Sequence, residues 1–142
     1  MANRILAVDD EDYIRDLVQI NLEKAGYEVL TATNGREACE VALAQQPDLI
    51  VMDVMMPEVD GITALQTLKD NPMTSEIPVI LLTAKDQNAD VFQGWKNGAD
   101  LYLTKPFQIR ELLVFVRRIL EASHEAEEGD KRYEVTQNTL PE

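Results

Sequence analysis

Acidic, hydroxyl and amine side chains follow four apolar runs of the sequence. Asp9 and Asp10 come after "RILAV", and Asp53 comes after "LIVM". Thr83 comes after "PVILL", and Lys105 ends the run "DLYLTK". Taken singly, such residues are usually turn formers, helix caps or solvated lysines. Their repetition at the ends of separate apolar runs instead predicts one shared site.

Carboxylates at such a site are expected to hold a divalent cation. Asp9, Asp10 and Asp53 would repel one another, and a bound cation relieves that repulsion. Hard oxygen ligands with positions left for water and a phosphoryl group favour Mg²⁺ over a full Ca²⁺ cage, and no EF-hand spacing is present. Mn²⁺ is expected to substitute for Mg²⁺.

The same residues suit phosphoryl transfer to a carboxylate. Asp53 ends a continuously apolar run and is the best candidate nucleophile, which would become an acyl phosphate. Lys105 and the metal would neutralise the transferring phosphoryl group, and the Thr83 hydroxyl would hydrogen-bond to it.

The elements that position these residues alternate between strand and helix. Helical patterns separate the apolar runs and predict an α/β fold, in which a doubly wound five-stranded parallel sheet carries helices on both faces. One helix is expected to begin with a capping box at Asn34 and Glu37. The last two helices are expected at about 87–97 and 108–122. The strands are expected at 4–8, 27–32, 49–52, 78–82 and 100–104. The carboxyl ends of parallel strands meet at one edge, where ligands bind.

Four motifs in this order carry a family resemblance. The sequences "VDD" at 8–10, "MDVMMPEVDG" at 52–61, "LLTA" at 81–84 and "LTKPF" at 103–107 closely resemble the receiver domain of two-component response regulators. The resemblance covers about residues 3–122. It implies the flavodoxin-like strand order 2-1-3-4-5.

The resemblance implies a role for each matching residue of the acidic site. Asp53 is the expected phosphoacceptor, Asp10 a direct Mg²⁺ ligand, and Asp9 a ligand acting mainly through water. The backbone carbonyl of Met55 is a further expected ligand, and Lys105 is expected to contact the phosphoryl group. The phosphoryl donor would be a sensor histidine kinase or a phosphotransfer protein.

The resemblance also implies a switch. Thr83 would move towards the phosphoryl group, and Tyr102 would move inward with it. The peptide bond before Pro106 is expected to be cis. These movements would change a face made of the fourth helix, the fifth strand and the fifth helix, through which an output protein or a second copy of the chain would bind. The apolar residues expected on that partner face are Ala89, Val91, Trp95, Leu101 and Phe115.

Met55 stands where receivers that hydrolyse their phosphoryl group quickly have a polar residue. An apolar group near the attacking water predicts slow autodephosphorylation. The chain is therefore expected to be a long-lived switch and not a turnover enzyme.

Composition limits the partners and the location. The 142 residues are 45% hydrophobic and carry a net charge of −13, which disfavours nucleic-acid binding by this chain itself. The sequence has neither a transmembrane segment nor a signal peptide, and it predicts a cytoplasmic protein without membrane contacts. Residues 1–122 are expected to form the receiver domain, and residues 123–142 an acidic disordered tail or linker. The single Cys39 excludes an internal disulfide.

Other functions remain open from the sequence. The chain is either a stand-alone regulator or the receiver fragment of a longer DNA-binding response regulator. A metal-dependent aspartyl phosphohydrolase is less favoured, because Met55 stands where the acid/base aspartate of such enzymes is needed. A cofactor-binding flavodoxin-like module is less favoured, because no glycine-rich or hydroxyl-rich phosphate loop follows the first strand of this sequence. A degenerate scaffold receiver conflicts with the intact acidic set.

Overall fold

A single parallel sheet organises the chain. The computed structural model describes residues 3–84 and 98–129. Its strands are β1 (Arg4–Val8), β2 (Glu28–Ala32), β3 (Leu49–Asp53), β4 (Val79–Ala84) and β5 (Leu101–Lys105). They pair in parallel in the order β2-β1-β3-β4-β5, which confirms the expected fold class and strand order. The helix expected at 87–97 falls outside the described residues.

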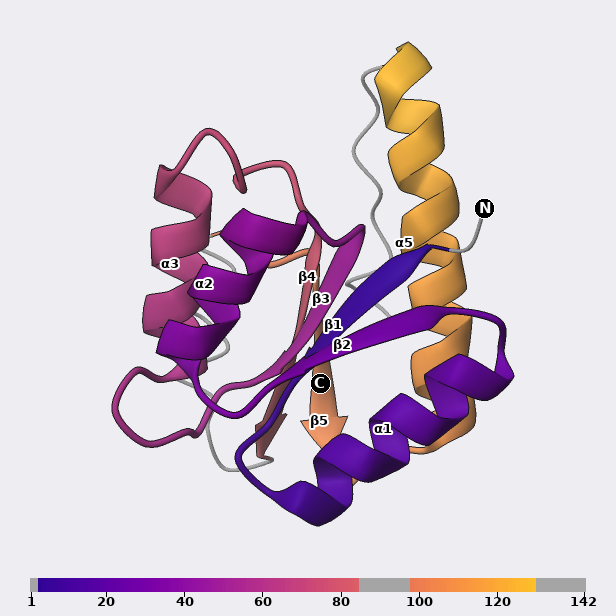
Figure 1. Ribbon diagram of the computed structural model, residues 1–142. Coiled ribbons are helices and arrows are strands. Elements are labelled where there is room, and N and C mark those ends of the chain that lie inside the picture. The colour runs from indigo at the N-terminus through magenta and orange to yellow at the C-terminus, as the bar shows by residue number, and fades with distance from the viewer. Residues whose placement is uncertain (1–2, 85–97, 130–142) are drawn as a thin grey trace.

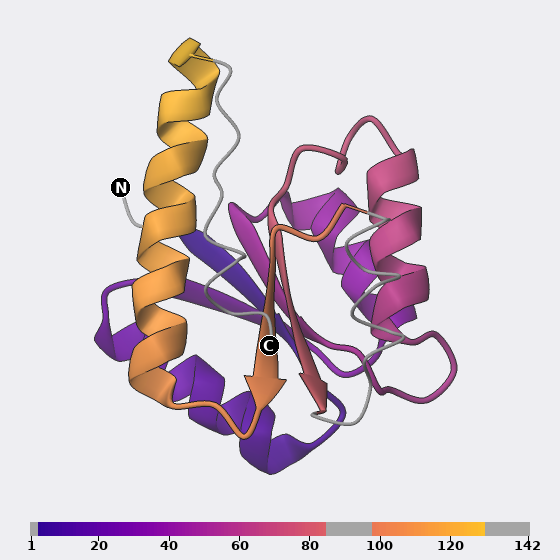
Figure 2. The ribbon, with the colours of Figure 1, turned by 180° about the vertical axis from the view of Figure 1, so that it is seen from behind.

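Helices cover both faces of this sheet. Helices α2 (Gly35–Gln45) and α3 (Gly61–Asp70) lie on one side, and α1 (Asp12–Lys24) and α5 (Ile109–Gly129) lie on the other (Figures 1 and 2). None of the helices in the described residues is long and apolar enough to cross a membrane.

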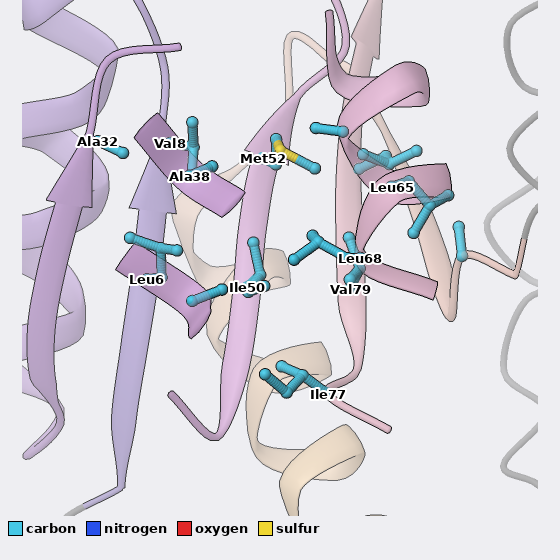
Figure 3. Packing of buried hydrophobic residues seen from close by; sticks show 14 of the residues in the cluster. Leu6, Val8, Ala32, Ala38, Ile50, Met52, Leu65, Leu68, Ile77 and Val79 are labelled. Atoms are coloured by element: carbon cyan, nitrogen blue, oxygen red, sulfur yellow. The ribbon is translucent and has the colours of Figure 1, made fainter. Parts of the chain in front are cut away.

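Alternation along the strands divides the core into two apolar layers. Leu6, Val8, Ile50 and Met52 pack with α2 and α3 (Figure 3). The intervening positions, which include Val51, pack with α1 and α5. Because central strands are covered on both faces, their sequences are continuously apolar rather than alternating. Every residue of β3 is buried, including Asp53 at its end.

Two helix caps set the loops that leave β2 and β3. The Asn34 side chain accepts a hydrogen bond from the backbone N–H of Glu37 at 2.8 Å, as the capping box predicts. The Glu37 carboxylate reaches one residue further back than expected and accepts from the backbone N–H of Thr33 at 2.7 Å. In α3, Asp60 accepts from the backbone N–H of Thr63 at 2.8 Å.

Helix α5 is longer than its sequence pattern predicts. It begins at Ile109 and continues past residue 122 to Gly129, so the first part of the expected tail is helical. The ribbon shows the end of α5 projecting beyond the sheet (Figure 1).

Two residues of the expected partner face belong to the core. Leu101 is fully buried and Phe115 is 8% exposed, and both pack in the layer beneath α1 and α5. Leu101 alternates with Tyr102 along β5, so its side chain turns towards that layer. This placement corrects the expectation that Leu101 and Phe115 lie on an exposed partner face. The remaining residues of that face, Ala89, Val91 and Trp95, lie outside the described residues.

Candidate functional site

Neighbouring strands bring the aspartates together at the carboxyl edge of the sheet. Strands β1 and β3 pair with Val8 opposite Met52, so Asp9 and Asp53 emerge side by side. Asp9 is 2% exposed and Asp53 is 5% exposed, whereas Asp10 faces solvent. One carboxylate oxygen from each of Asp9, Asp10 and Asp53 lies within 4.8 Å of the others. The three aspartates that the sequence predicts as one site are therefore adjacent.

Lys105 ends the edge strand β5 and reaches this cluster along the same carboxyl edge of the sheet. Its Nζ lies 3.1 Å from Asp53 Oδ1 and 3.5 Å from Asp9 Oδ2. On the solvent side, Lys105 Nζ lies 3.9 Å from Glu11 Oε1. The ammonium group thus faces one carboxylate at the end of β3 and two in the loop after β1.

Burial and mutual repulsion change the protonation of these groups. Burial, followed by the charge of Asp9, raises the pKa of Asp53 from 3.8 to about 6, although Lys105 works in the opposite direction. Burial likewise raises the pKa of Asp9. For Lys105, burial disfavours the ammonium form, but the carboxylates of Asp53 and Asp9 outweigh that effect and raise its pKa.

The donor atoms fit a divalent cation. Within the described residues, Asp9 Oδ2 is a buried oxygen that accepts no hydrogen bond, and its distance from Lys105 Nζ is that of a loose ion pair. The other oxygen, Oδ1, accepts from the backbone N–H of Glu11 at 3.0 Å. A buried carboxylate oxygen without a hydrogen bond is costly unless a charge compensates it. A cation held by Asp9, Asp10 and Asp53 would provide that compensation.

The expected switch residues are buried near this edge. Thr83 is 1% exposed and lies on β4, one position beyond Leu82, which pairs with Asp53. Tyr102 is also 1% exposed and packs in the layer beneath α2 and α3. The Lys105–Pro106 peptide bond is cis, which confirms the expectation for Pro106.

Met55 lies just beyond β3 with its side chain 59% exposed. Its exposure leaves an apolar group at the surface two residues after Asp53. The proposed role of its backbone carbonyl as a ligand stays a prediction.

Sequence reasoning missed two residues that support the site. Gly61 packs against the backbone of Asp53, where a Cβ atom would lie only 2.3 Å from the Asp53 carbonyl oxygen. Arg15 donates a hydrogen bond from Nη1 to the carbonyl oxygen of Asp9 at 2.8 Å. The glycine at the start of α3 was a visible signal for a close approach, whereas an arginine inside α1 gave none.

Comparison with known proteins identifies relatives over most of the chain. The family model of the response regulator receiver domain matches residues 5–117. The chain is 46% identical over 132 residues to the DNA-binding dual master transcriptional regulator RpaA of Synechocystis, covering 93% of this chain and 55% of RpaA. The chain therefore spans about half the length of the curated relatives it matches.

Solved structures share the fold, and one of them contains a metal ion. The chemotaxis response regulator CheY4 of Vibrio cholerae superposes with a TM-score of 0.78 at 34% identity, over 84% of this chain and 99% of CheY4. The receiver domain of the sensor histidine kinase PA1611 from Pseudomonas aeruginosa has a TM-score of 0.79 at 29% identity, over 85% of this chain and 99% of that domain. Its structure contains a magnesium ion coordinated in the active site cleft.

Proposed function

Because the chain belongs to the response regulator receiver family, we propose that it is a phosphorylation-activated switch of a two-component relay, with Asp53 as its phosphoacceptor. The observation that carries this proposal is the placement of buried Asp53 at 3.1 Å from the Lys105 ammonium and beside Asp9 and Asp10. The phosphoryl donor is a sensor histidine kinase or a phosphotransfer protein. The family is one of signalling domains and not a classical enzyme family.

Asp10, Asp9 and Asp53 would hold Mg²⁺, with Asp9 acting mainly through water and the Met55 carbonyl as a further ligand. When bound, the ion supplies positive charge that offsets the carboxylates and the incoming phosphoryl oxygens. The donor set is made of hard oxygens, which also suits Mn²⁺.

The reaction uses the ionised form of Asp53. One carboxylate oxygen attacks the phosphorus of a phosphohistidine, the O–P bond forms as the N–P bond breaks, and the bond electrons stay with the leaving imidazole. Asp53, with a pKa of about 6 before any cation is bound, is mainly ionised at neutral pH. Lys105 neutralises charge on the transferred group, and Thr83 donates a hydrogen bond to a phosphoryl oxygen.

Phosphorylation then shifts the population between two packings. Thr83 moves towards the new phosphoryl oxygens, and the inward position of Tyr102, which is 1% exposed beneath α2 and α3, becomes the more populated one. The surface of β5, α5 and the helix expected at 87–97 would change with them, and an output protein or a second copy would bind there.

The phosphoryl group is expected to be long-lived. A thioether is a weak hydrogen-bond acceptor, so the exposed Met55 side chain is poorly suited to orient an attacking water. Autodephosphorylation of Asp53 is therefore slow.

The test is to incubate the full chain with Mg²⁺ and acetyl phosphate or phosphoramidate and to measure intact mass. One hydroxylamine-labile phosphoryl group is expected in wild type and none in Asp53→Asn. Equal modification of Asp53→Asn, or an unmodified wild type, would overturn the proposal. Continuous release of phosphate from small phosphate esters would instead support a phosphohydrolase.

A receiver that forms part of a longer DNA-binding regulator is a second candidate. It is favoured by the 55% coverage of RpaA, which is described as DNA-binding. Reading the coding sequence beyond Glu142 distinguishes the two, since only the second candidate continues into an effector domain.

A further inference from the structure

Arg15 ties the loop that carries the metal-binding carboxylates to helix α1. Its Nη1 donates to the carbonyl oxygen of Asp9 at 2.8 Å, and that carbonyl belongs to the peptide joining Asp9 to Asp10. Its Nη2 contacts the Asp12 carboxylate in the first turn of α1. The Arg15 side chain is only 16% exposed, whereas Asp12 is 85% exposed, so the bond to the Asp9 carbonyl is partly buried and the contact with Asp12 faces solvent.

Two backbone hydrogen bonds also hold this loop: the Asp9 N–H donates to the Ala32 carbonyl oxygen at 3.2 Å, and the Arg15 N–H donates to the Glu11 carbonyl oxygen at 3.0 Å. Neither of them involves the Asp9 carbonyl oxygen. The N-cap residue of α1, Glu11, makes no side-chain capping hydrogen bond. Its backbone N–H is held by Asp9 Oδ1 at 3.0 Å. Arg15 also borders a narrow space next to Asp9 and Val18 that has no room for a water molecule.

We propose that Arg15 is a positioning residue for metal binding. By fixing the peptide between Asp9 and Asp10, its planar fork orients both carboxylates towards Asp53. This inference rests on the proposed metal-dependent function, and it adds a residue that contacts neither the metal nor the phosphoryl group.

Electrostatics alone predicts the opposite effect of removing Arg15. A positive charge near a cation site repels the cation, so its loss would tighten Mg²⁺ binding. Asp12 contacts the guanidinium, but its side chain is 85% exposed, so solvent screens the pair and Asp12 offsets only part of the Arg15 charge. The bond to the Asp9 carbonyl is the partly buried contact of Arg15, so we expect the positional effect to be the larger one. The two accounts therefore differ in the sign of the change in affinity.

The experiment is calorimetric titration of Mg²⁺ into the full metal-free chain. Arg15→Met is expected to raise the Kd for Mg²⁺ about tenfold, the usual lower range for a residue that orients metal ligands. Arg15→Lys keeps the charge but loses the fork, and its Kd is expected to lie between those of wild type and Arg15→Met. Arg36→Met is the matched control, because Arg36 pairs with Glu40 on the exposed surface of α2 at 3.3 Å.

Two further measurements distinguish the loss of carboxylate positioning from a general destabilisation of the fold. In metal-free protein, the Asp10 and Glu11 amides of the Arg15 variants are expected to exchange faster than those of wild type and Arg36→Met. With acetyl phosphate, labelling of Asp53 should slow at limiting Mg²⁺ and recover at saturating Mg²⁺.

If Arg15→Met binds Mg²⁺ as tightly as wild type or more tightly, the inference is overturned. If Arg15→Met does not fold, Arg15→Lys decides, and an unchanged Kd for Mg²⁺ in that variant overturns the inference. If wild type itself fails to bind Mg²⁺, the proposed function fails instead. If wild type binds Mg²⁺ and is phosphorylated while the Arg15 variants behave like it, only the role of Arg15 is lost.

Discussion

Lys105 Nζ lies 3.1 Å from Asp53 Oδ1 although β4 lies between their strands in the sheet. The long lysine side chain crosses the carboxyl edge of the sheet and places its charge against the buried carboxylate. One ammonium group thereby balances part of the charge of Asp53, at the end of β3, and of Asp9, directly after the neighbouring strand β1.

Replacing Asp53 by asparagine is expected to stabilise the metal-free protein at neutral pH. Because folding raises the pKa of Asp53 from 3.8 to about 6, its favourable contribution is present below pH 4 and lost as the pH rises through 6. Asp53→Asn should therefore gain up to about 2 to 3 kcal/mol over wild type at pH 7.5, with the difference vanishing near pH 4. Urea denaturation in EDTA measures this, and Asp16→Asn on the exposed face of α1 is the control. A pH-independent difference would contradict the burial of an ionised Asp53.

Replacing Lys105 by methionine should separate metal binding from phosphorylation. Loss of the ammonium removes a charge that competes with a cation, so Mg²⁺ should bind severalfold more tightly. Labelling of Asp53 by acetyl phosphate should slow by about a hundredfold even at saturating Mg²⁺, because charge on the phosphoryl group is no longer neutralised. Calorimetry and intact-mass kinetics give the two values, and unchanged labelling would remove Lys105 from the proposed site.

Adding a methyl group at Gly61 should disturb the backbone that holds Asp53. A Cβ there would lie 2.3 Å from the Asp53 carbonyl oxygen and 2.9 Å from Val54 Cα, so the chain must shift. Gly61→Ala is expected to lower the free energy of unfolding by about 1 to 3 kcal/mol and to slow labelling of the folded protein.

Gly26→Ala is the control for Gly61→Ala. Gly26 has a φ of +101° but no atom within 4 Å of a built Cβ, so alanine there strains the backbone away from the site. It should destabilise the fold and leave the labelling rate of folded protein unchanged. Equal labelling rates in the two variants would argue against the link between Gly61 and Asp53.

A polar residue at position 55 should shorten the life of the phosphoryl group. Met55→Asn offers a hydrogen bond to an incoming water and is expected to speed autodephosphorylation at least severalfold. Met73→Asn is the matched control, since Met73 is 63% exposed and Met55 is 59% exposed. Decay of labelled protein after removal of acetyl phosphate gives the rate. Identical decay in wild type and Met55→Asn would show that another group limits hydrolysis.

The sheet and its reactive edge were predictable because apolar runs and their ends carry a strong local signal. The strands predicted at 4–8 and 49–52 correspond to β1 and β3 within a residue, and Asp9, Asp10, Asp53 and Lys105 converge as expected.

Contacts that depend on three-dimensional packing were not predictable. The bond from Arg15 to the Asp9 carbonyl depends on how the first loop enters α1, which no sequence period encodes. Leu101 and Phe115 were assigned to the wrong surface because an apolar residue on a strand or helix does not reveal which neighbour covers it. The continuation of α5 past residue 122 was missed because its polar composition resembles a linker, although Ala and Glu are strong helix formers.

The distribution of the acidic site over β1, β3 and β5 links signalling to folding. Asp9, Asp53 and Lys105 are distant in the chain and meet only when β1, β3, β4 and β5 have paired in the sheet. A nascent or partly unfolded chain has the individual residues but not the site, since such long-range pairings form late. Incompletely folded molecules would therefore be silent in the relay and would not transmit a false signal.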